Sequence, residues 1–149
     1  MKSLPTAQLL HADITYKLRG IFFTVYNELG FGHKELLYQK ALVKEFDAEH
    51  IPYLREHAVK VSYKGEYLGL YVPDFIIADK IILEIKAIEF LPQSAQEQIL
   101  HYLKTTGFEL GLLVNFGSSK IFIKRLVNQN PRKSAINQRE SLANGGEQK

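Results

Sequence analysis

The first third of the chain has apolar residues at intervals of three and four positions, which is the periodicity of amphipathic helices. Ile14, Leu18 and Ile21, for example, fall on one helical face. A later helical pattern begins where Ser94 and Glu97 have the spacing of a capping box. A Gly or Pro stop signal follows each pattern. The helices predicted in this way are 13–29 (before Gly30), 34–49 (before Pro52) and 94–106 (before Gly107).

The remaining segments are of β type, rich in Val, Ile, Leu and Tyr, with Gly and Pro between them. Segment 81–88 is apolar on both sides of the pleat, which is typical of a central strand covered on two faces. Segment 66–77 is interrupted by Gly69 and Pro73. The expected strands are 57–63, 66–77, 81–88, 110–115 and 120–126. The order helix, helix, three strands, helix, two strands predicts an α/β fold.

Composition narrows the class of protein. At 149 residues, with 46% hydrophobic and 23% charged side chains, the chain has the size of one globular domain. It has no cysteine, which excludes zinc ribbons, iron–sulfur clusters, thiol nucleophiles and disulfide scaffolds. No run approaches ~20 apolar residues, and the first residues lack the apolar core of a signal peptide. We therefore expect a cytoplasmic protein that does not bind membranes.

The net charge of +3 lies mostly at the C-terminal end. Segment 128–149 has four Lys/Arg and two Asp/Glu, which leaves fifteen basic and fourteen acidic residues in 1–127. It also lacks periodicity and large apolar residues, so we expect a folded domain over 1–127 and a disordered polar tail over 128–149. Because the domain is nearly neutral, DNA would have to meet a local basic patch or a site whose acids are covered by metal ions.

Two charged residues interrupt the most apolar predicted strand. Alternation places Glu84 and Lys86 on one face of segment 81–88. Unpaired buried charge is expensive, so a central strand has no structural use for these residues. A surface ion pair on a half-exposed strand would also explain them.

Asp74 lies across a short connection from Glu84, and the length of that connection decides whether the two carboxylates meet. A two-residue loop would pair Ala78 with Ile81 and turn Asp74 to the wrong face. A three-residue loop, or a bulge, would place Asp74 opposite Glu84. The shared site therefore requires one of these two irregular connections.

A third acid, Glu35, falls between Leu42 and Phe46 in the apolar sector of the second helix. Its place in the first helical turn, facing the positive end of the helix dipole, is an alternative explanation. Carboxylates and main-chain carbonyls are the ligands that Mg²⁺ prefers. The sequence therefore predicts a Mg²⁺ site, in which Mn²⁺ can substitute, formed by Glu35, Asp74, Glu84 and the Ile85 carbonyl oxygen.

Such a site suits hydrolysis of a phosphodiester. A bound metal ion generates a hydroxide-like water and neutralises charge on the phosphorane that forms. Lys86 could hold or help deprotonate that water and adds positive charge near the transition state. These residue types predict a metal-dependent phosphodiesterase with Asp74, Glu84 and Lys86 as catalytic residues.

With Pro73-Asp74 and Glu84-Ile85-Lys86, the chain resembles the PD-(D/E)xK nuclease superfamily. A more specific resemblance, to the small bacterial GxxExxR proteins, is carried by LGFGHKELLY at 29–38, YKG at 63–65, QILHYLKTTG at 98–107 and LGLLVNFG at 110–117. It spans about 14–127. Tyr38 stands where the family name requires Arg, so no phosphate-binding role is assigned to it.

The resemblance implies metal binding at Asp74 and Glu84, a catalytic Lys86 and an accessory acid at Glu35. Gln98 and Tyr102 match a Q-x-x-x-Y pattern of related nucleases, although Tyr102 is equally explained as a core residue. The implied fold is a restriction-endonuclease-like core, a mixed central sheet of four to five strands flanked by helices. The implied activity is that of a nuclease, with DNA favoured over RNA.

Basic side chains outside this set could guide a nucleic-acid backbone, although each taken singly is explained as a solvated surface charge. The candidates are Lys34, Lys104, Lys120, Lys124 and Arg125. Two other classes of function remain open: a catalytically silent nucleic-acid-binding module and a protein-interaction module. A homodimer is possible, since one site cuts one strand at a time.

Overall fold

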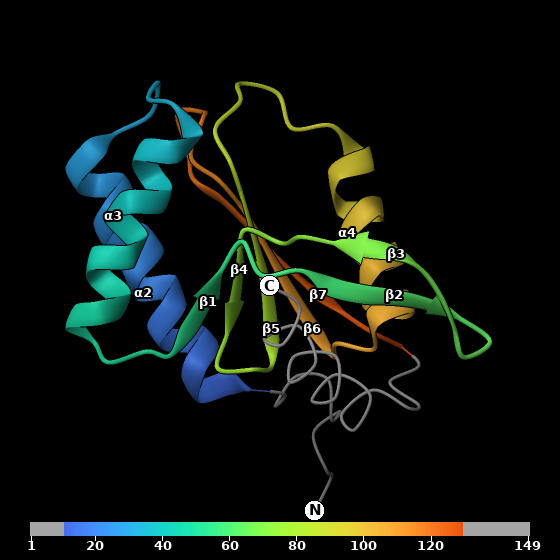
Figure 1. Ribbon diagram of the computed structural model, residues 1–149. Helices are drawn as coiled ribbons and strands as arrows, with labels where there is room; N and C mark the ends of the chain where they lie inside the picture. The colour runs from blue at the N-terminus through green and yellow to red at the C-terminus, as the bar shows by residue number, and fades with distance from the viewer. Residues whose placement is uncertain (1–10, 130–149) are drawn as a thin grey trace, which may run out of the picture.

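The computed structural model describes residues 11–129, and it has three layers (Figure 1). A five-stranded sheet lies in the middle. Helices α2 (Ala12–Leu29) and α3 (Glu35–Ala48) cover one face, while α4 (Gln93–Thr106) and a two-stranded hairpin cover the other. No helix in this part of the chain has the length and apolarity needed to cross a membrane.

The central sheet is mixed, with strand order β1-β4-β5-β6-β7. Among the described strands of this sheet, β5 and β6 pair in parallel and the other neighbours pair antiparallel. The strands are β1 (Tyr53–Arg55), β4 (Phe75–Ile77), β5 (Ile81–Lys86), β6 (Leu110–Asn115) and β7 (Phe122–Val127). The predicted class, an α/β fold with a mixed sheet of four to five strands flanked by helices, is confirmed.

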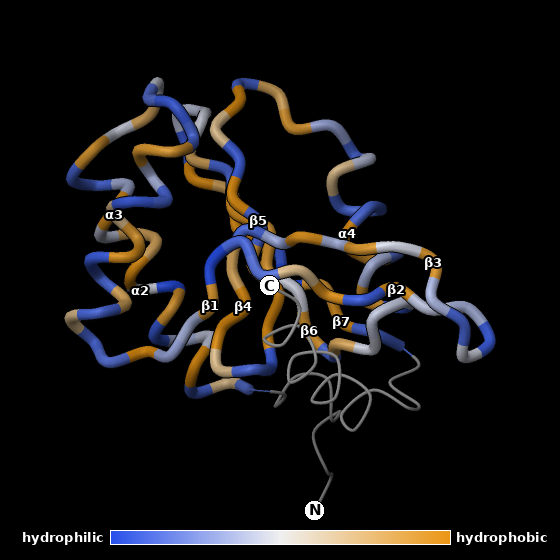
Figure 2. Tube along the Cα trace, in the orientation of Figure 1, coloured by the Kyte–Doolittle hydropathy of each residue, from blue (hydrophilic) through white to orange (hydrophobic). Residues whose placement is uncertain are grey.

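Strand β5 is the central strand, as its sequence predicts, and it separates two hydrophobic cores. Ile81, Leu83 and Ile85 pack against α2 and α3. Ile82 packs against α4, and alternation places Glu84 and Lys86 on this same side. Figure 2 shows hydrophobic segments concentrated on the central strands. The charged pair of β5 therefore faces α4.

The prediction of one strand over 66–77 is wrong. The segment divides at Val72-Pro73-Asp74 into β3 (Glu66–Tyr71) and β4, which belong to different sheets. Strand β3 pairs only with β2 (Val59–Tyr63) in the separate hairpin. Pro73 has no N–H to donate to a ladder, which explains why the strand breaks there.

The sequence predicts the C-terminal ends of α2 and α4 correctly but not the start of α4 or the end of the folded domain. Gly30 and Gly107 end their helices with positive φ angles of 67° and 83°, as expected of Gly stop signals. The prediction of a capping box at Ser94 is wrong. Helix α4 begins at Gln93, so Ser94 lies inside the helix, and no side chain caps its N-terminus at Pro92. Asn128, assigned to the tail, is buried and donates from its side chain to the Leu103 and Phe108 carbonyls. The rest of the predicted tail, from residue 130, lies outside the described residues.

Candidate active site

The connection between β4 and β5 has the three-residue length that a shared carboxylate site requires. Ile77 pairs with Ile81, so residues 78–80 form the loop. Ala78 and Asp79 adopt left-handed φ angles of 52° and 57°, and Lys80 N–H donates to the Ile77 carbonyl at 3.0 Å. The antiparallel register continues to Phe75, and its next position sets Asp74 opposite Glu84. The required register is therefore present without a bulge.

Asp74 lies immediately before β4, and its side chain replaces the backbone as the hydrogen-bond partner of β5 at this position. Ile85 N–H donates to Asp74 Oδ2 at 2.7 Å. The Asp74 carbonyl in turn accepts from Glu56 N–H at 3.1 Å, which fixes the backbone. Because the N–H and C=O of one strand residue leave by the same edge, the Ile85 carbonyl oxygen lies on the edge that faces Asp74.

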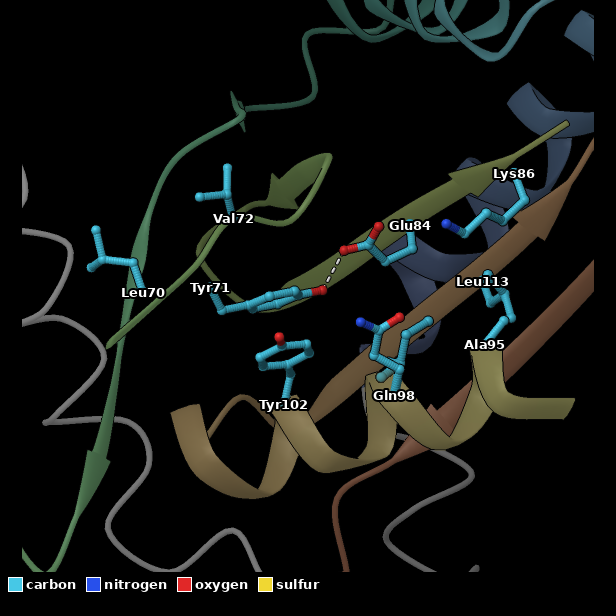
Figure 3. Close-up of a pocket in the computed structure, with 10 residues that line it drawn as sticks. Leu70, Tyr71, Val72, Glu84, Lys86, Ala95, Gln98, Tyr102 and Leu113 are labelled. Atoms are coloured by element: carbon cyan, nitrogen blue, oxygen red, sulfur yellow. Dashed lines mark hydrogen bonds between the residues drawn. The ribbon is translucent and has the colours of Figure 1, made fainter. Parts of the chain in front are cut away.

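Glu84 lies at the bottom of a pocket of about 280 Å³ between the hairpin and α4. Tyr71 O–H donates to Glu84 Oε1, and the Tyr71 ring stacks on Tyr102 with centroids 3.6 Å apart (Figure 3). Lys86 lines the same pocket with its side chain turned toward Glu84, and Gln98 faces them from α4. Tyr102 is thus both a pocket residue and a residue packed against the α4 core.

The electrostatic environment of Glu84 favours its neutral form. Burial and the neighbouring Asp74 charge raise the pKa of Glu84 to about 8, against the opposing effects of the Tyr71 hydroxyl and Lys86. Lys86 offsets burial and the charge of Asp74 only in part, so Glu84 lacks full compensating positive charge. A cation that approaches both carboxylates would supply it.

Glu35 is half-buried in the first turn of α3 and belongs to the same electrostatic neighbourhood. Burial raises its pKa, the charge of Asp74 raises it further, and Lys86 opposes both. Gln39 Nε2 donates to Glu35 Oε1 at 3.4 Å, and Arg55 Nη2 donates to Gln39 Oε1 at 3.2 Å. This side-chain chain holds Glu35 at the margin of the site.

The three carboxylates do not form a ready-made cage. Between residues 11 and 129, no group of three or more His, Cys, Asp or Glu side chains is arranged to hold a metal ion. Glu35 comes from a helix that covers the other face of the sheet from α4. Its participation at one ion with Asp74 and Glu84 stays a prediction.

The donor set nevertheless fits a hard divalent cation. Mg²⁺ is commonly held by one or two carboxylates and keeps several waters. Asp74 and Glu84 supply two carboxylates, and the charge of Asp74 disfavours ionisation of Glu84 in the absence of a cation. The Ile85 carbonyl is a third oxygen on the same edge of β5.

Three residues near the site were missed by the sequence reasoning. The sequence pattern places Tyr71 in a strand without assigning it a role, although it lies only three residues before Asp74 of the Pro73-Asp74 motif. Gln39 gave no signal, and Arg55 belongs to β1, which is too short for a periodicity to show. The Arg55 guanidinium lies 6.0 Å from the centroid of Phe75, and its Nε is buried without a hydrogen-bond partner.

The predicted basic rim is dispersed. None of its members lines the pocket of Glu84: they are Lys34, Lys104, Lys120, Lys124 and Arg125. The four lysines are exposed, and Arg125 donates to Thr15 of α2 at 3.3 Å. Lys86 is the basic residue that lines the pocket beside Glu84.

The fold and the site define a class: an α/β domain in which two carboxylates and a lysine meet where the central strand loses its antiparallel neighbour. A family model described as the PD-(D/E)XK nuclease superfamily matches residues 12–126, and the chain belongs to this superfamily. Members typically use a divalent metal and act on nucleic acids.

Similarity to individual proteins is slight. A solved structure, an alkaline exonuclease from Laribacter hongkongensis, matches with a TM-score of 0.36 and 11% sequence identity over 70% of this chain. The match covers 62% of the exonuclease chain. No curated protein matches the sequence.

Proposed function

We propose that the protein is a metal-dependent nuclease that hydrolyses phosphodiester bonds, with DNA as the favoured substrate. The observation that carries the proposal is the convergence of Asp74 and Glu84 at the open edge of β5, with Lys86 on the same strand. Superfamily membership supports the class of reaction. The narrower likeness to the GxxExxR proteins rests on the sequence runs described above.

Asp74 and Glu84 would hold a Mg²⁺ or Mn²⁺ ion, together with the Ile85 carbonyl oxygen. When bound, the ion supplies Lewis acidity and lowers the pKa of a water bound to it. Asp74 is fixed for this role because Ile85 N–H donates to its Oδ2, and its Oδ1 would be the oxygen that contacts the ion. Glu84 is oriented by the Tyr71 hydroxyl through Oε1.

Lys86 would orient the attacking water or a non-bridging phosphoryl oxygen and offset the negative charge that develops during attack. Gln98, from the facing helix, can donate its amide to another phosphoryl oxygen. Glu35, whose pKa is raised by burial and by the charge of Asp74, would serve as the accessory acid of the same site. The proposed catalytic and accessory groups thus come from β5 and from the elements on both of its faces.

Cleavage of labelled single- and double-stranded DNA and RNA tests the proposal. Wild type is compared with Glu84→Gln and Lys86→Met in Mg²⁺, in Mn²⁺ and with a chelator. The matched controls are Glu97→Gln and Lys44→Met, which change exposed side chains of α4 and α3 outside the pocket. Thermal melting establishes that each variant is folded.

We expect cleavage that requires the divalent ion and falls about 100-fold or more in both site variants but not in the controls. Wild-type activity in folded Glu84→Gln and Lys86→Met would refute the assignment. If wild type cleaves nothing yet binds nucleic acid in a salt-sensitive manner, the silent binding module is the correct function.

A further inference from the structure

Three loops with no role in the proposed hydrolysis gather beyond the C-terminal ends of β5 and β6 (Figure 1). They are 30–34 after α2, 87–92 after β5 and 116–121 between β6 and β7. Together they line a pocket of about 710 Å³. Two of the three contain sequence runs that carry the family resemblance, namely GFGHK and FG.

Buried side chains tie these loops to one another. Tyr38 O–H donates to the Gly30 carbonyl at 2.6 Å, and the Tyr38 ring stacks on Phe116 with centroids 4.7 Å apart. The Asn115 side chain accepts from Ile88 N–H at 3.1 Å and donates to the Ile88 carbonyl at 2.9 Å. The pocket is therefore a preformed feature of the fold.

The third loop is also tied to α2 and to the second loop. Tyr26 O–H, from α2, donates to the Ser118 carbonyl at 2.7 Å. At Gly117 a Cβ atom would collide with the backbone of Ala87 and Ile88. Glycine at this position lets the third loop pack directly against the second.

Two aromatic rings at this pocket remain in solvent despite the rigid surroundings. Phe90 is 84% exposed and Phe31 is 58% exposed, and they belong to different loops. Ser118, Ser119 and His33 add polar groups to the lining, which also contains one acid, Glu89. The exposed Lys34 and Lys120 lie outside the lining and adjoin it in sequence. Flat apolar faces beside hydroxyl groups and cations match a nucleotide, which has an apolar base face, polar edges and an anionic backbone.

The pocket adjoins the proposed active site at the end of β5, although the two share no lining residue. Ala87, in its lining, directly follows Lys86 in the chain. A nucleic-acid strand whose phosphate reaches Lys86 would therefore bring a neighbouring nucleotide to Phe31 and Phe90. In a duplex, each base is stacked on its neighbours and its faces are covered, so only an unpaired base can stack on these rings.

We propose that this loop pocket, lined by Phe31, Phe90 and Ser119, binds an unpaired base next to the scissile phosphate, so that the preferred substrate is a single-stranded segment or an unpaired strand end. The proposal rests on the proposed nuclease function for the place of the scissile phosphate. The base-binding step itself requires no catalysis.

Binding of fluorescent oligonucleotides in the Glu84→Gln background, without divalent ions, tests the base pocket separately from cleavage. Single-stranded and duplex DNA of one sequence are compared for Phe90→Ala, Phe31→Ala and Phe90→Trp. Tyr16→Ala is the matched control, because Tyr16 is 81% exposed on α2 and lies outside this pocket. Melting temperatures verify that each variant is folded.

Each Phe→Ala change should weaken single-strand binding by about 5- to 150-fold, the equivalent of about 1–3 kcal/mol of base stacking. Phe90→Trp should retain binding, and duplex binding and Tyr16→Ala should change little. Equal losses for single strand and duplex, or no loss for either, would overturn the proposal; the second result would point instead to a protein partner on these rings. If wild type cleaves nothing while these selective losses occur, the base pocket stands and the nuclease function fails.

Discussion

Replacing Glu84 with Gln is expected to stabilise the metal-free protein, and to do so increasingly as the pH rises toward 9. Glutamine keeps the size of the protonated acid and an oxygen that can accept from Tyr71 O–H. It removes only the ability to ionise beside Asp74. The variant therefore isolates the electrostatic cost that the site bears when no cation is present.

The magnitude follows from linkage between protonation and folding. The pKa of Glu84 is about 8 in the folded protein against an ordinary value of 4.5. Below pH 4.5 the acid is protonated in both states, so its stabilising effect is fully present, and this effect is lost as the pH rises through 8. At about 1.4 kcal/mol per pH unit, the wild type loses about 3 kcal/mol by pH 7 and about 5 kcal/mol by pH 9.

Urea unfolding of wild type and Glu84→Gln between pH 5 and 9, in the presence of a chelator, measures this cost. The difference between the two free energies of unfolding should grow with pH, because titration of all other groups is common to both. Glu97→Gln, an exposed carboxylate, provides the control. Added Mg²⁺ should stabilise wild type more strongly at high pH and leave the variant nearly unaffected. Parallel pH profiles for the two proteins would refute the reasoning.

Two further substitutions have definite expectations. Tyr71→Phe keeps the ring that stacks on Tyr102 but removes the hydroxyl that stabilises ionised Glu84, so the pKa of Glu84 rises further. The Mg²⁺ concentration needed for half-maximal cleavage at pH 7 should then increase several-fold, and an unchanged requirement would contradict this. Gly117→Ala should destabilise the protein by about 1–3 kcal/mol in urea titrations, because its Cβ would meet the backbone of Ala87 and Ile88. Gly69→Ala, in open space, is the control, and equal stability of the two variants would count against the packing argument.

The sequence predicts the helices and the central strand well, because their structure depends mainly on residues close together in the chain. The three-and-four spacing and the following glycine are sufficient for α2, and the run of Ile and Leu at 81–83 with Ile85 is sufficient for the central strand. Segment 66–77 shows the limit of such reasoning. Its residues are of β type on both sides of Pro73, but the partners of β3 and β4 lie in different sheets, and the composition of a strand does not encode its pairing partner.

The site likewise has contacts that the sequence predicts and contacts that it does not. Counting residues between Ile77 and Ile81 predicts that Asp74 reaches Glu84, because strand register follows from loop length. The contact between Tyr71 and Glu84 could not be predicted, because it depends on how the hairpin folds over α4. Whether Glu35 joins the two carboxylates at one ion could not be decided from the sequence, because helical periodicity gives the face on which Glu35 lies but not its distance from the sheet edge.

The most direct test of the central claim is anomalous diffraction from a crystal of the protein soaked with Mn²⁺. The account predicts one strong peak within coordination distance of the Asp74 and Glu84 carboxylates and the Ile85 carbonyl oxygen, absent from Asp74→Asn. A well-ordered site without a peak there, at a Mn²⁺ concentration that supports cleavage, would contradict it.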